Sequence, residues 1–485
     1  MHLEDHDRHA TPTDPRDSEL VSLTAAQLHA RYAAGDLTPI DVTEAVLARI
    51  ARLEPQLGAF YVVEAASARR AARESTERWD RGEPLGPLDG VPITLKENIA
   101  TIGTPVPSGT AALADAPPVT ADGPTALSTA RAGTVRLGKT VMPDYGMLSS
   151  GVSSLHGVTR SPWNPAWTVG GSSGGASAAA AARFGPIHVG SDIGGSIRLP
   201  ATWTGLAGLK PTYALVPVDP PYIGRAIGPL ARTVEDVALA MAVLARPDPA
   251  HRDYTHIDRP LDWARATTPL SEEEVAGLRV GIHVDAGCGL PTDPEVARIV
   301  ADGGAVFERA GAVVEPIGPV IAAEHLRLLD LFLRARSWLD LTRLAPAARA
   351  SVLPYIEQWA AGAADLDGSQ VIDAYQGVQA MRAATTAATW DYDVVLSPVA
   401  PVAAFPAHWH GPTNDPATAL DHIAYTAPYN FSEQPAASLN AGFTADGRPV
   451  GVQLAARRFD DVRLLRIAGW YEGARRSSAT PVWPD

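Results

Sequence analysis

Three short segments of this 485-residue chain carry residue types that could do chemistry. Two of them set serines among glycines, at residues 170–175 and 190–198, and the third ends an apolar run with Lys96. A serine hydroxyl is a nucleophile when a neighbouring base activates it, and a lysine amine is a base when it is neutral. Each segment also has an ordinary structural interpretation.

The first segment, GGSSGG, leads directly into an Ala-rich stretch. Its glycines permit positive φ and close approach of the backbone, and a following helix would offer free N–H groups. The ordinary interpretation is a helix N-cap with a flexible lead-in. A phosphate-binding loop is disfavoured because no Lys-Ser/Thr pair follows. Gly171, Ser173 and Gly175 also match a nucleophile elbow, but SPWNPAW precedes them where that motif needs a strand.

The second segment, GSDIGGSIR, follows the apolar run IHV, which predicts a strand. Two glycines directly before Ser196 leave their backbone N–H groups unobstructed, as an oxyanion site requires. Taken alone, the same residues would equally form a simple turn.

Lys96 ends the apolar run VPITLK and is one of only three lysines in the chain. In an extended strand Ile93 and Leu95 share one face, while Thr94 and Lys96 share the other. A lysine at such a place usually extends along apolar surface towards water. If it is buried instead, its pKa falls and it becomes available as a neutral base.

Taken together, Lys96, Ser172 and Ser196 resemble the Ser–cisSer–Lys triad of the amidase signature family. The resemblance is carried by GVPITLKENI, by SPWNP followed by GGSSGG, and by GSDIGGSIRLPA followed by GLAGLKPT. It continues more weakly over residues 20–475, including YDVVLSPVAP and GRPVGVQLAA. The chain is identified as a member of this family, and we expect an aryl acylamidase or a urethanase-like amidase.

The resemblance implies a role for each matching residue. Ser196 matches the nucleophile, Ser172 the serine in a cis peptide bond that relays the proton, and Lys96 the terminal base. The oxyanion hole corresponds to the backbone amides of Ile193, Gly194, Gly195 and Ser196. An acyl-enzyme on Ser196, resolved by water, then accounts for hydrolysis with neither metal nor cofactor.

Other residues match positions around this triad. Those expected to support the Ser196 loop are Ser173, Ser191, Asp192 and Arg198. For Asp192 and Arg198 the structural alternative is turn capping and a surface ion pair. Lys139 and Lys210 lie in family-like segments and are expected to be structural.

The segment KTVMPDYG, which begins at Lys139, departs from the Lys-Thr-Asn and acidic–aromatic pattern common in the family. In relatives it usually borders the acyl pocket. The residues that we expect to line the pocket are Tyr145, Met147, Leu148, Tyr222 and Ile223. These side chains could equally belong to the core. As a pocket wall they favour an apolar or aromatic acyl or leaving group over a charged one.

The elements that must position these residues alternate between helix and strand. Helical patterns cover residues 20–82, 174–184, 234–244 and 293–310, and short apolar runs such as residues 278–282 predict strands. This alternation predicts an α/β fold with a large mixed β-sheet covered by α-helices on both faces.

The organisation of the chain follows from the same patterns. We expect a disordered tail at residues 1–19 and a single amidase domain at residues 20–485. Its expected parts are a helical start (20–82), a catalytic signature core (83–245), a variable substrate-side part (246–430) and a C-terminal return to the sheet (431–485). Residues 405–425, rich in Pro, His and aromatics, are expected to form a rim over the pocket.

Composition narrows the function further. A single cysteine, Cys288, excludes a disulfide framework, a multi-thiolate zinc site and an iron–sulfur cluster. The net charge of −14 disfavours nucleic acid or an anionic membrane as a partner. No apolar run reaches the length of about 18 residues that a membrane span needs, and the polar first residues lack a signal-peptide core, so we expect a cytoplasmic protein. His2, His6 and His9 have helical metal-ligand spacing, but in the expected tail they suggest adventitious binding only.

The leading hypothesis is a hydrolase of small amides, anilides, aryl esters or carbamates, with a homodimer as one expected state. The alternative within the family is the glutamine-hydrolysing component of a tRNA-dependent amidotransferase. A binding scaffold on the same fold is disfavoured because all three triad positions are present. An α/β-hydrolase that uses Ser173 would instead make Ser173→Ala the inactive variant.

Overall fold

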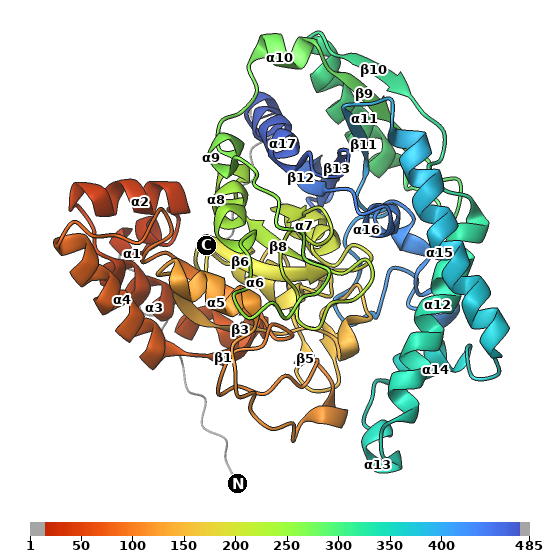
Figure 1. Ribbon diagram of the computed structural model, residues 1–485, viewed down its shortest axis with the longest axis horizontal. Coiled ribbons are helices and arrows are strands. Elements are labelled where there is room, and N and C mark those ends of the chain that lie inside the picture. Colours follow the sequence, from red (N-terminus) through yellow and green to blue (C-terminus); the bar gives the residue numbers. More distant parts are fainter. Residues whose placement is uncertain (1–14, 476–485) are drawn as a thin grey trace.

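The computed structural model describes residues 15–475, in which eleven strands form one mixed sheet (Figure 1). The order across the sheet is β1-β3-β2-β6-β8-β7-β12-β13-β11-β9-β10. The strands are β1 (Phe60–Val63), β2 (Pro92–Lys96), β3 (Val135–Thr140), β6 (Ile187–Asp192), β7 (Ala207–Lys210), β8 (Ala226–Ala231), β9 (Arg279–Ile282), β10 (Val313–Pro316), β11 (Val394–Pro398), β12 (Ala436–Phe443) and β13 (Pro449–Ala455). A separate pair joins β4 (Val152–Ser153) to β5 (Gly157–Val158).

The sheet contains both kinds of pairing. β2 lies parallel to β3 and to β6, and β9 lies parallel to β10 and to β11, whereas β6–β8, β7–β12 and β12–β13 are antiparallel. Strands far apart in sequence are therefore neighbours, which places the ends of β2 and β6 side by side. The predicted α/β class with a large mixed sheet is confirmed.

Helices surround this sheet along the whole described chain. The first half contains α1 (Pro15–Leu20), α2 (Ala25–Ala34), α3 (Pro39–Leu57), α4 (Ala65–Asp80), α5 (Pro124–Arg131), α6 (Gly174–Ala181), α7 (Arg198–Thr204) and α8 (Val234–Leu244). The second half contains α9 (Trp263–Ala266), α10 (Glu272–Ala276), α11 (Pro294–Arg309), α12 (Ala323–Thr342), α13 (Pro346–Arg349), α14 (Pro354–Ala361), α15 (Gly368–Thr389), α16 (Ala427–Phe431) and α17 (Asp461–Arg475). Short 3-10 turns lie at Ala111–Leu113, Asp144–Gly146, Pro416–Thr418 and Asp421–Ile423.

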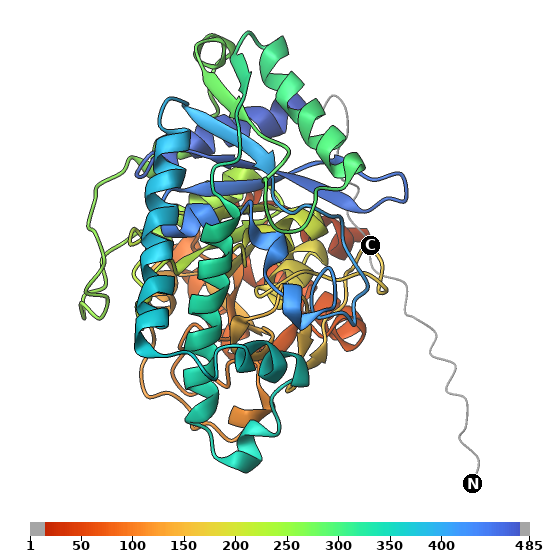
Figure 2. The ribbon, with the colours of Figure 1, turned by 90° about the vertical axis from the view of Figure 1, so that its right-hand side faces the viewer.

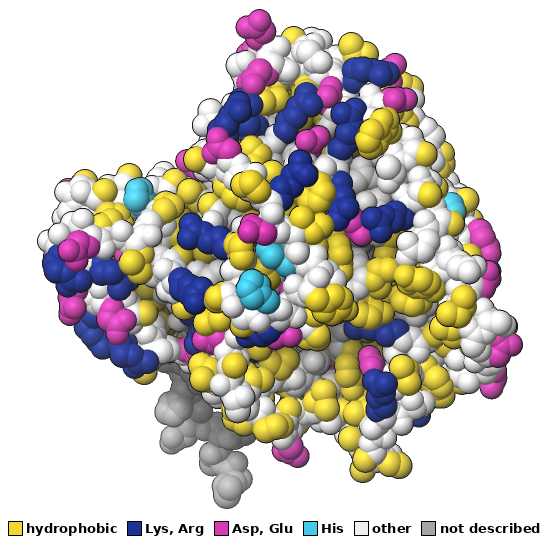
Figure 3. Space-filling view, in the orientation of Figure 1, with side chains coloured by type: hydrophobic (Ala, Val, Ile, Leu, Met, Phe, Trp, Pro, Cys, Tyr) yellow, Lys and Arg dark blue, Asp and Glu magenta, His cyan; other side chains and the backbone are white. Residues whose placement is uncertain are grey.

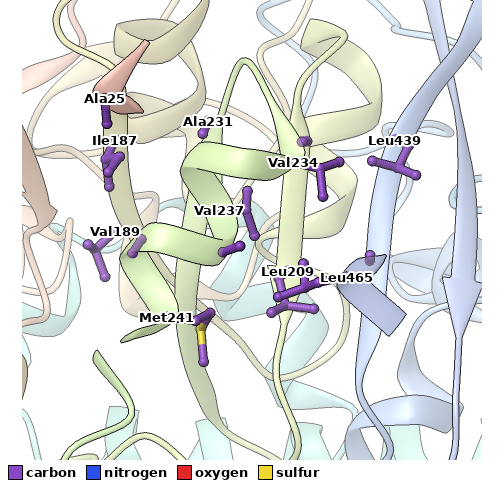
Figure 4. Close-up of a cluster of buried hydrophobic side chains, with 14 of the residues drawn as sticks. Ala25, Ile187, Val189, Leu209, Ala231, Val234, Val237, Met241, Leu439 and Leu465 are labelled. Carbon is purple, nitrogen blue, oxygen red and sulfur yellow. The ribbon is translucent and has the colours of Figure 1, made fainter. Parts of the chain in front are cut away.

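Both faces of the sheet carry helices where β8 crosses its centre. Successive residues of a strand point to opposite faces. Leu230 packs with Ala176 of α6 and Ala201 of α7, whereas Ile227 and Ala231 belong to the larger apolar cluster on the other side. In that larger cluster α8 presents Val234, Val237 and Met241 towards Ile187 and Val189 of β6 (Figure 4). The buried core therefore lies on both sides of the strands that lead to the Gly/Ser segments.

The predicted helices begin where the sequence supplies caps. Thr24 and Thr38 each accept a hydrogen bond from the backbone three residues on and complete a capping box, and Thr233 accepts one at the start of α8. The expected tail at residues 1–19 differs from the structure in one respect, because residues 15–20 form α1. Its residues 1–14, with His2, His6 and His9, lie outside the described residues.

Helices α12, α14 and α15 form a separate layer at one side of the molecule (Figures 1 and 2). They pack on a second apolar cluster that includes Leu333, Trp359 and Met381. On the face seen in Figure 3, basic and acidic side chains are interspersed among apolar ones. Within residues 15–475 no helix combines the length and apolar character needed to cross a membrane.

Candidate active site

The three residues of the expected triad come from neighbouring elements. Lys96 is the last residue of β2, Ser172 lies just before α6, and Ser196 lies between β6 and α7. Because β2 and β6 pair in parallel, with Leu95 opposite Val189, both strands deliver their carboxyl ends to the same edge of the sheet. Ligand sites of α/β sheets form at such edges.

Lys96 contacts the serine pair at this edge. Its side chain is fully buried, with Nζ 2.7 Å from Ser172 Oγ and 3.1 Å from Ser173 Oγ. The peptide bond between Gly171 and Ser172 is cis, at the position that the family resemblance implies. Burial, and then the positive charge of Arg225, lower the pKa of Lys96 from 10.5 to about 7. A large share of Lys96 is therefore neutral near pH 7 and can accept a proton.

Ser196 and Ser172 line one cavity of about 430 Å³. The backbone N–H of Ser173 donates to the Ser196 carbonyl at 3.1 Å, which ties the two serine loops together. The Ser196 hydroxyl makes no hydrogen bond to any residue of the described chain. It therefore faces the cavity free to meet a substrate carbonyl.

The backbone amides before Ser196 are held by Asp192. Asp192 Oδ1 accepts the Gly195 N–H at 2.8 Å, and Oδ2 accepts the Ile197 N–H at 3.1 Å. Of the four amides expected to form an oxyanion hole, the Gly195 amide is thus already engaged. Within residues 15–475 the amides of Ile193, Gly194 and Ser196 have no hydrogen-bond acceptor. These three remain available to an oxyanion.

Glycine is required at position 195 for two reasons. Its φ of 127° is strained for any residue with a side chain, and a Cβ there would lie 2.6 Å from Thr426 Oγ1. The same Thr426 hydroxyl donates to the Gly194 carbonyl at 2.6 Å. The loop that carries Ser196 is consequently fixed from outside by the segment that begins α16.

Asp192 and Arg198 form a buried ion pair, which excludes the surface ion pair considered from the sequence. Both side chains are inaccessible, with Arg198 Nη2 2.9 Å from Asp192 Oδ1. Arg198 also donates to Gln453 Oε1 at 2.7 Å and to Asn430 Oδ1 at 2.6 Å. Burial alone would raise the pKa of Asp192, but the charge and hydrogen bonds of Arg198 outweigh it and hold that pKa well below its usual range. Asp192 therefore stays charged and keeps its grip on the loop.

Ser173 and Ser191 join the network that surrounds Lys96. Ser173 Oγ donates to the Ser191 carbonyl at 3.2 Å and accepts the Ser191 N–H at 3.3 Å. The Asn98 side chain donates to Ser191 Oγ at 3.0 Å. These bonds connect the ends of β2 and β6 and the start of α6, so Ser173 is a positioning residue and not an exposed elbow nucleophile.

The expected pocket residues divide into two groups. Tyr145 and Met147 line the cavity. Leu148 does not, because it is buried in the second apolar cluster with Leu199 and Trp203. Tyr222 and Ile223 are also absent from the cavity wall: Tyr222 lies under the guanidinium of Arg336, 4.1 Å from its ring centre, and Ile223 packs against the same second cluster.

The cavity has further lining residues that sequence reasoning missed. They come from segments distant in sequence, and no local motif marks them. The polar ones are Asn98, Ser108, Arg225, Arg336, Ser337 and Asp340, and the apolar ones are Val106, Leu113, Met142, Pro220, Leu341, Leu344 and Ile356.

The expected rim at residues 405–425 is wrong as a cover for this cavity. Phe405, Trp409 and Pro412 line a different cavity, together with Trp167 and Arg448. The end of the segment still bears on the site, because Ile423 and Thr426 contact the Ser196 loop at Gly194.

The remaining candidates lie away from the cavity. Lys139 is buried in β3, and Lys210 donates to the Pro211 carbonyl at 2.8 Å. Cys288 packs against the second apolar cluster. In the described part of the chain no three His, Cys, Asp or Glu side chains gather closely enough to hold a metal ion.

Comparison with known proteins agrees with this geometry. The amidase family model matches residues 41–465. An acylamidase of Rhodococcus erythropolis is 35% identical over 473 residues, covering 93% of this chain and 95% of the relative. The glutamyl-tRNA(Gln) amidotransferase A-type component of Chloroflexus aggregans is also 35% identical, over 493 residues that cover 94% and 97%. The crystal structure of a bacterial aryl acylamidase has a TM-score of 0.85 and 26% identity, covering 95% of this chain and 99% of that one.

The fold and these similarities define an enzyme that hydrolyses carbon–nitrogen bonds. More narrowly, the chain belongs to the amidase signature family.

Proposed function

We propose that this amidase cleaves small apolar or aromatic amides and anilides through an acyl-enzyme on Ser196, and that the same site accepts aryl esters and carbamates. The observation that carries the proposal is the buried Lys96 amine, 2.7 Å from Ser172 Oγ, beside a cavity that Ser196 also lines. No metal or cofactor enters the proposed reaction.

The proposed steps move one proton along this path. Neutral Lys96 takes the proton of Ser172, which takes the proton of Ser196 as Ser196 Oγ attacks the substrate carbonyl carbon. The proton then returns along the same path to the leaving nitrogen as the carbon–nitrogen bond breaks. Water, activated by the same relay, attacks the acyl-enzyme and releases the acid.

The negative charge that develops on the carbonyl oxygen would be met by the amides of Ile193, Gly194 and Ser196. Preorganised donors of this kind usually make the largest contribution to such catalysis. Asp192 and Arg198 act here as positioning residues, because they hold the loop and do not touch the reacting atoms.

The cavity wall supports an apolar substrate. Met142, Tyr145, Met147, Leu341 and Ile356 present hydrocarbon surface to a volume of about 430 Å³, which accommodates a small aromatic amide. The similar proteins named acylamidase and aryl acylamidase agree with this choice. Aryl esters and carbamates need the same serine and oxyanion donors, so they are included in the proposal.

The proposal is tested with Ser196→Ala and a fluorophosphonate probe. We expect the variant to lose anilide turnover and covalent labelling, and Lys96→Ala to lose both to a large degree. Ser351→Ala, at an exposed serine on the α13–α14 connection, is the matched control and should retain both. Full activity of Ser196→Ala would overturn the mechanism.

The alternative is the glutamine-hydrolysing component of a tRNA-dependent amidotransferase, since relatives of that kind are as similar as the acylamidase. The two functions separate in one assay of the isolated chain. Release of aniline from anilides without glutaminase activity supports the amidase, and the reverse result supports the amidotransferase component. We also infer that residues 20–485 act as one domain, because a single sheet takes strands from Phe60 to Ala455.

A further inference from the structure

Two arginines face the Ser196 cavity without an ion-pair partner. Arg225 and Arg336 both line the cavity, and no carboxylate in the described part of the chain lies within 4.0 Å of either guanidinium. Most other arginines near carboxylates in this structure do form such pairs, including Arg198, buried a few residues from Ser196. Two unpaired guanidinium groups in one reaction cavity leave strong donors available to a ligand.

Arg225 is held in place while most of its donors stay free. It closes a turn by donating its backbone N–H to the Tyr222 carbonyl at 3.0 Å, and its Nη1 donates to the Pro220 carbonyl at 3.2 Å. Burial and the nearby charge of Arg336 lower the pKa of Arg225 to about 10. It is therefore still charged at neutral pH, yet poorly solvated.

Arg336 approaches the same cavity from helix α12. Its guanidinium stacks on the Tyr222 ring at 4.1 Å, which fixes the plane of the group and leaves its edge available for hydrogen bonds. Like charges placed together in this way are costly unless an anion lies between them. The two arginines reach the cavity from separate elements, so their convergence is a property of the fold.

The carboxylates nearby do not neutralise this pair. Asp340 lines the cavity one helical turn from Arg336, but its ion-pair contact is with Arg343, at 4.0 Å. Asp192 is committed to Arg198. Asp219 acts on Arg225 at longer range, without an ion pair.

We propose that Arg225 and Arg336 bind a carboxylate carried by the substrate, so that the preferred substrates are small amides with an apolar body and one anionic end. This inference rests on the proposed function and makes it narrower. The apolar wall accepts the hydrocarbon part, and paired guanidinium groups are suited to a carboxylate because their N–H donors match its two oxygens. It also revises the expectation from the sequence that a charged group would be disfavoured.

The test compares matched substrates that differ by the carboxylate alone. On the acyl side these are the mono-4-nitroanilide of glutaric acid and the 4-nitroanilide of pentanoic acid. On the leaving-group side they are N-acetyl-4-aminobenzoate and N-acetyl-4-aminobenzamide. The readout is the ratio of kcat/KM within each pair, measured at pH 9, for the wild type, Arg225→Gln and Arg336→Gln. Any general loss of activity in a variant affects both members of a pair and cancels in the ratio.

We expect the wild type to prefer the carboxylated member of at least one pair, and the side on which this occurs locates the anionic end. Arg225→Gln should reduce that ratio by about 10- to 100-fold, as the loss of a charge-assisted hydrogen bond predicts, and Arg336→Gln should reduce it as well. Arg298→Gln, which removes an exposed arginine on α11, should leave the ratio unchanged.

Two results overturn the inference, and they are distinguishable. If neutral anilides are hydrolysed with no preference for a carboxylate, or if the preference survives in Arg225→Gln, the inference fails while the proposed function stands. If no substrate is hydrolysed and the fluorophosphonate does not label Ser196, the proposed function fails and the inference fails with it.

Discussion

The pH dependence of kcat/KM should report the protonation of Lys96. Burial and the charge of Arg225 lower the pKa of this lysine to about 7, and only the neutral amine can accept the Ser172 proton. Activity should therefore rise with pH through that pKa. The neutral fraction is about 9% at pH 6 and about 91% at pH 8, so kcat/KM should rise about 10-fold over this interval and then level off. An ordinary lysine pKa would instead give a rise of about 100-fold with no plateau until beyond about pH 11.

The assay measures initial rates with a neutral anilide from pH 5.5 to 9.5 at constant ionic strength. A second measurement assigns the midpoint. Arg225→Gln removes a positive charge that lowers the pKa of Lys96, so its midpoint should move to higher pH, whereas Arg298→Gln should leave it in place. A rate that is flat over the whole range would refute the role of Lys96 as the base, and an unmoved midpoint in Arg225→Gln would refute its assignment to Lys96.

Three further substitutions follow from the packing around the site. Asp192→Asn leaves the Arg198 guanidinium buried without its charge partner, which should lower the free energy of unfolding by about 3–5 kcal/mol; an unchanged Tm would contradict this. Gly195→Ala places a Cβ 2.6 Å from Thr426 Oγ1, so kcat should fall at least about 100-fold while Tm drops little, and near-normal kcat would mean that the loop is not rigid. Leu148→Ala should cost about 2–5 kcal/mol in stability with little change in KM, whereas Met147→Ala should change KM for bulky acyl groups; the opposite pattern would reverse their assignment to core and cavity.

The triad could be predicted from sequence because its residues lie in local motifs. The glycines around Ser172 and Ser196 meet backbone requirements that any chain with this geometry must satisfy, and Gly195 shows this directly through its φ of 127°. The strands that carry them were predictable for a similar reason, since apolar runs such as VPITLK and IHV are buried in the middle of the sheet.

The cavity wall could not be predicted in the same way. Met147 and Leu148 are adjacent in a segment with no regular periodicity, so their sequence gives no indication which one faces the cavity. Arg225 and Arg336 are 111 positions apart, and only the packing of α12 brings them together. The burial of Asp192 and Arg198 is likewise a tertiary property, because their partners Asn430 and Gln453 lie more than 200 residues further along the chain.

The central claim is that Ser196 is the residue that carries the acyl group. The direct measurement is intact-protein and peptide mass spectrometry after the enzyme is mixed with a slowly hydrolysed aryl carbamate. The account predicts one carbamoyl group, attached at Ser196 and missing in Ser196→Ala. A carbamoyl group attached instead at Ser172 or Ser173, or turnover of the carbamate with no adduct and full activity in Ser196→Ala, would contradict it.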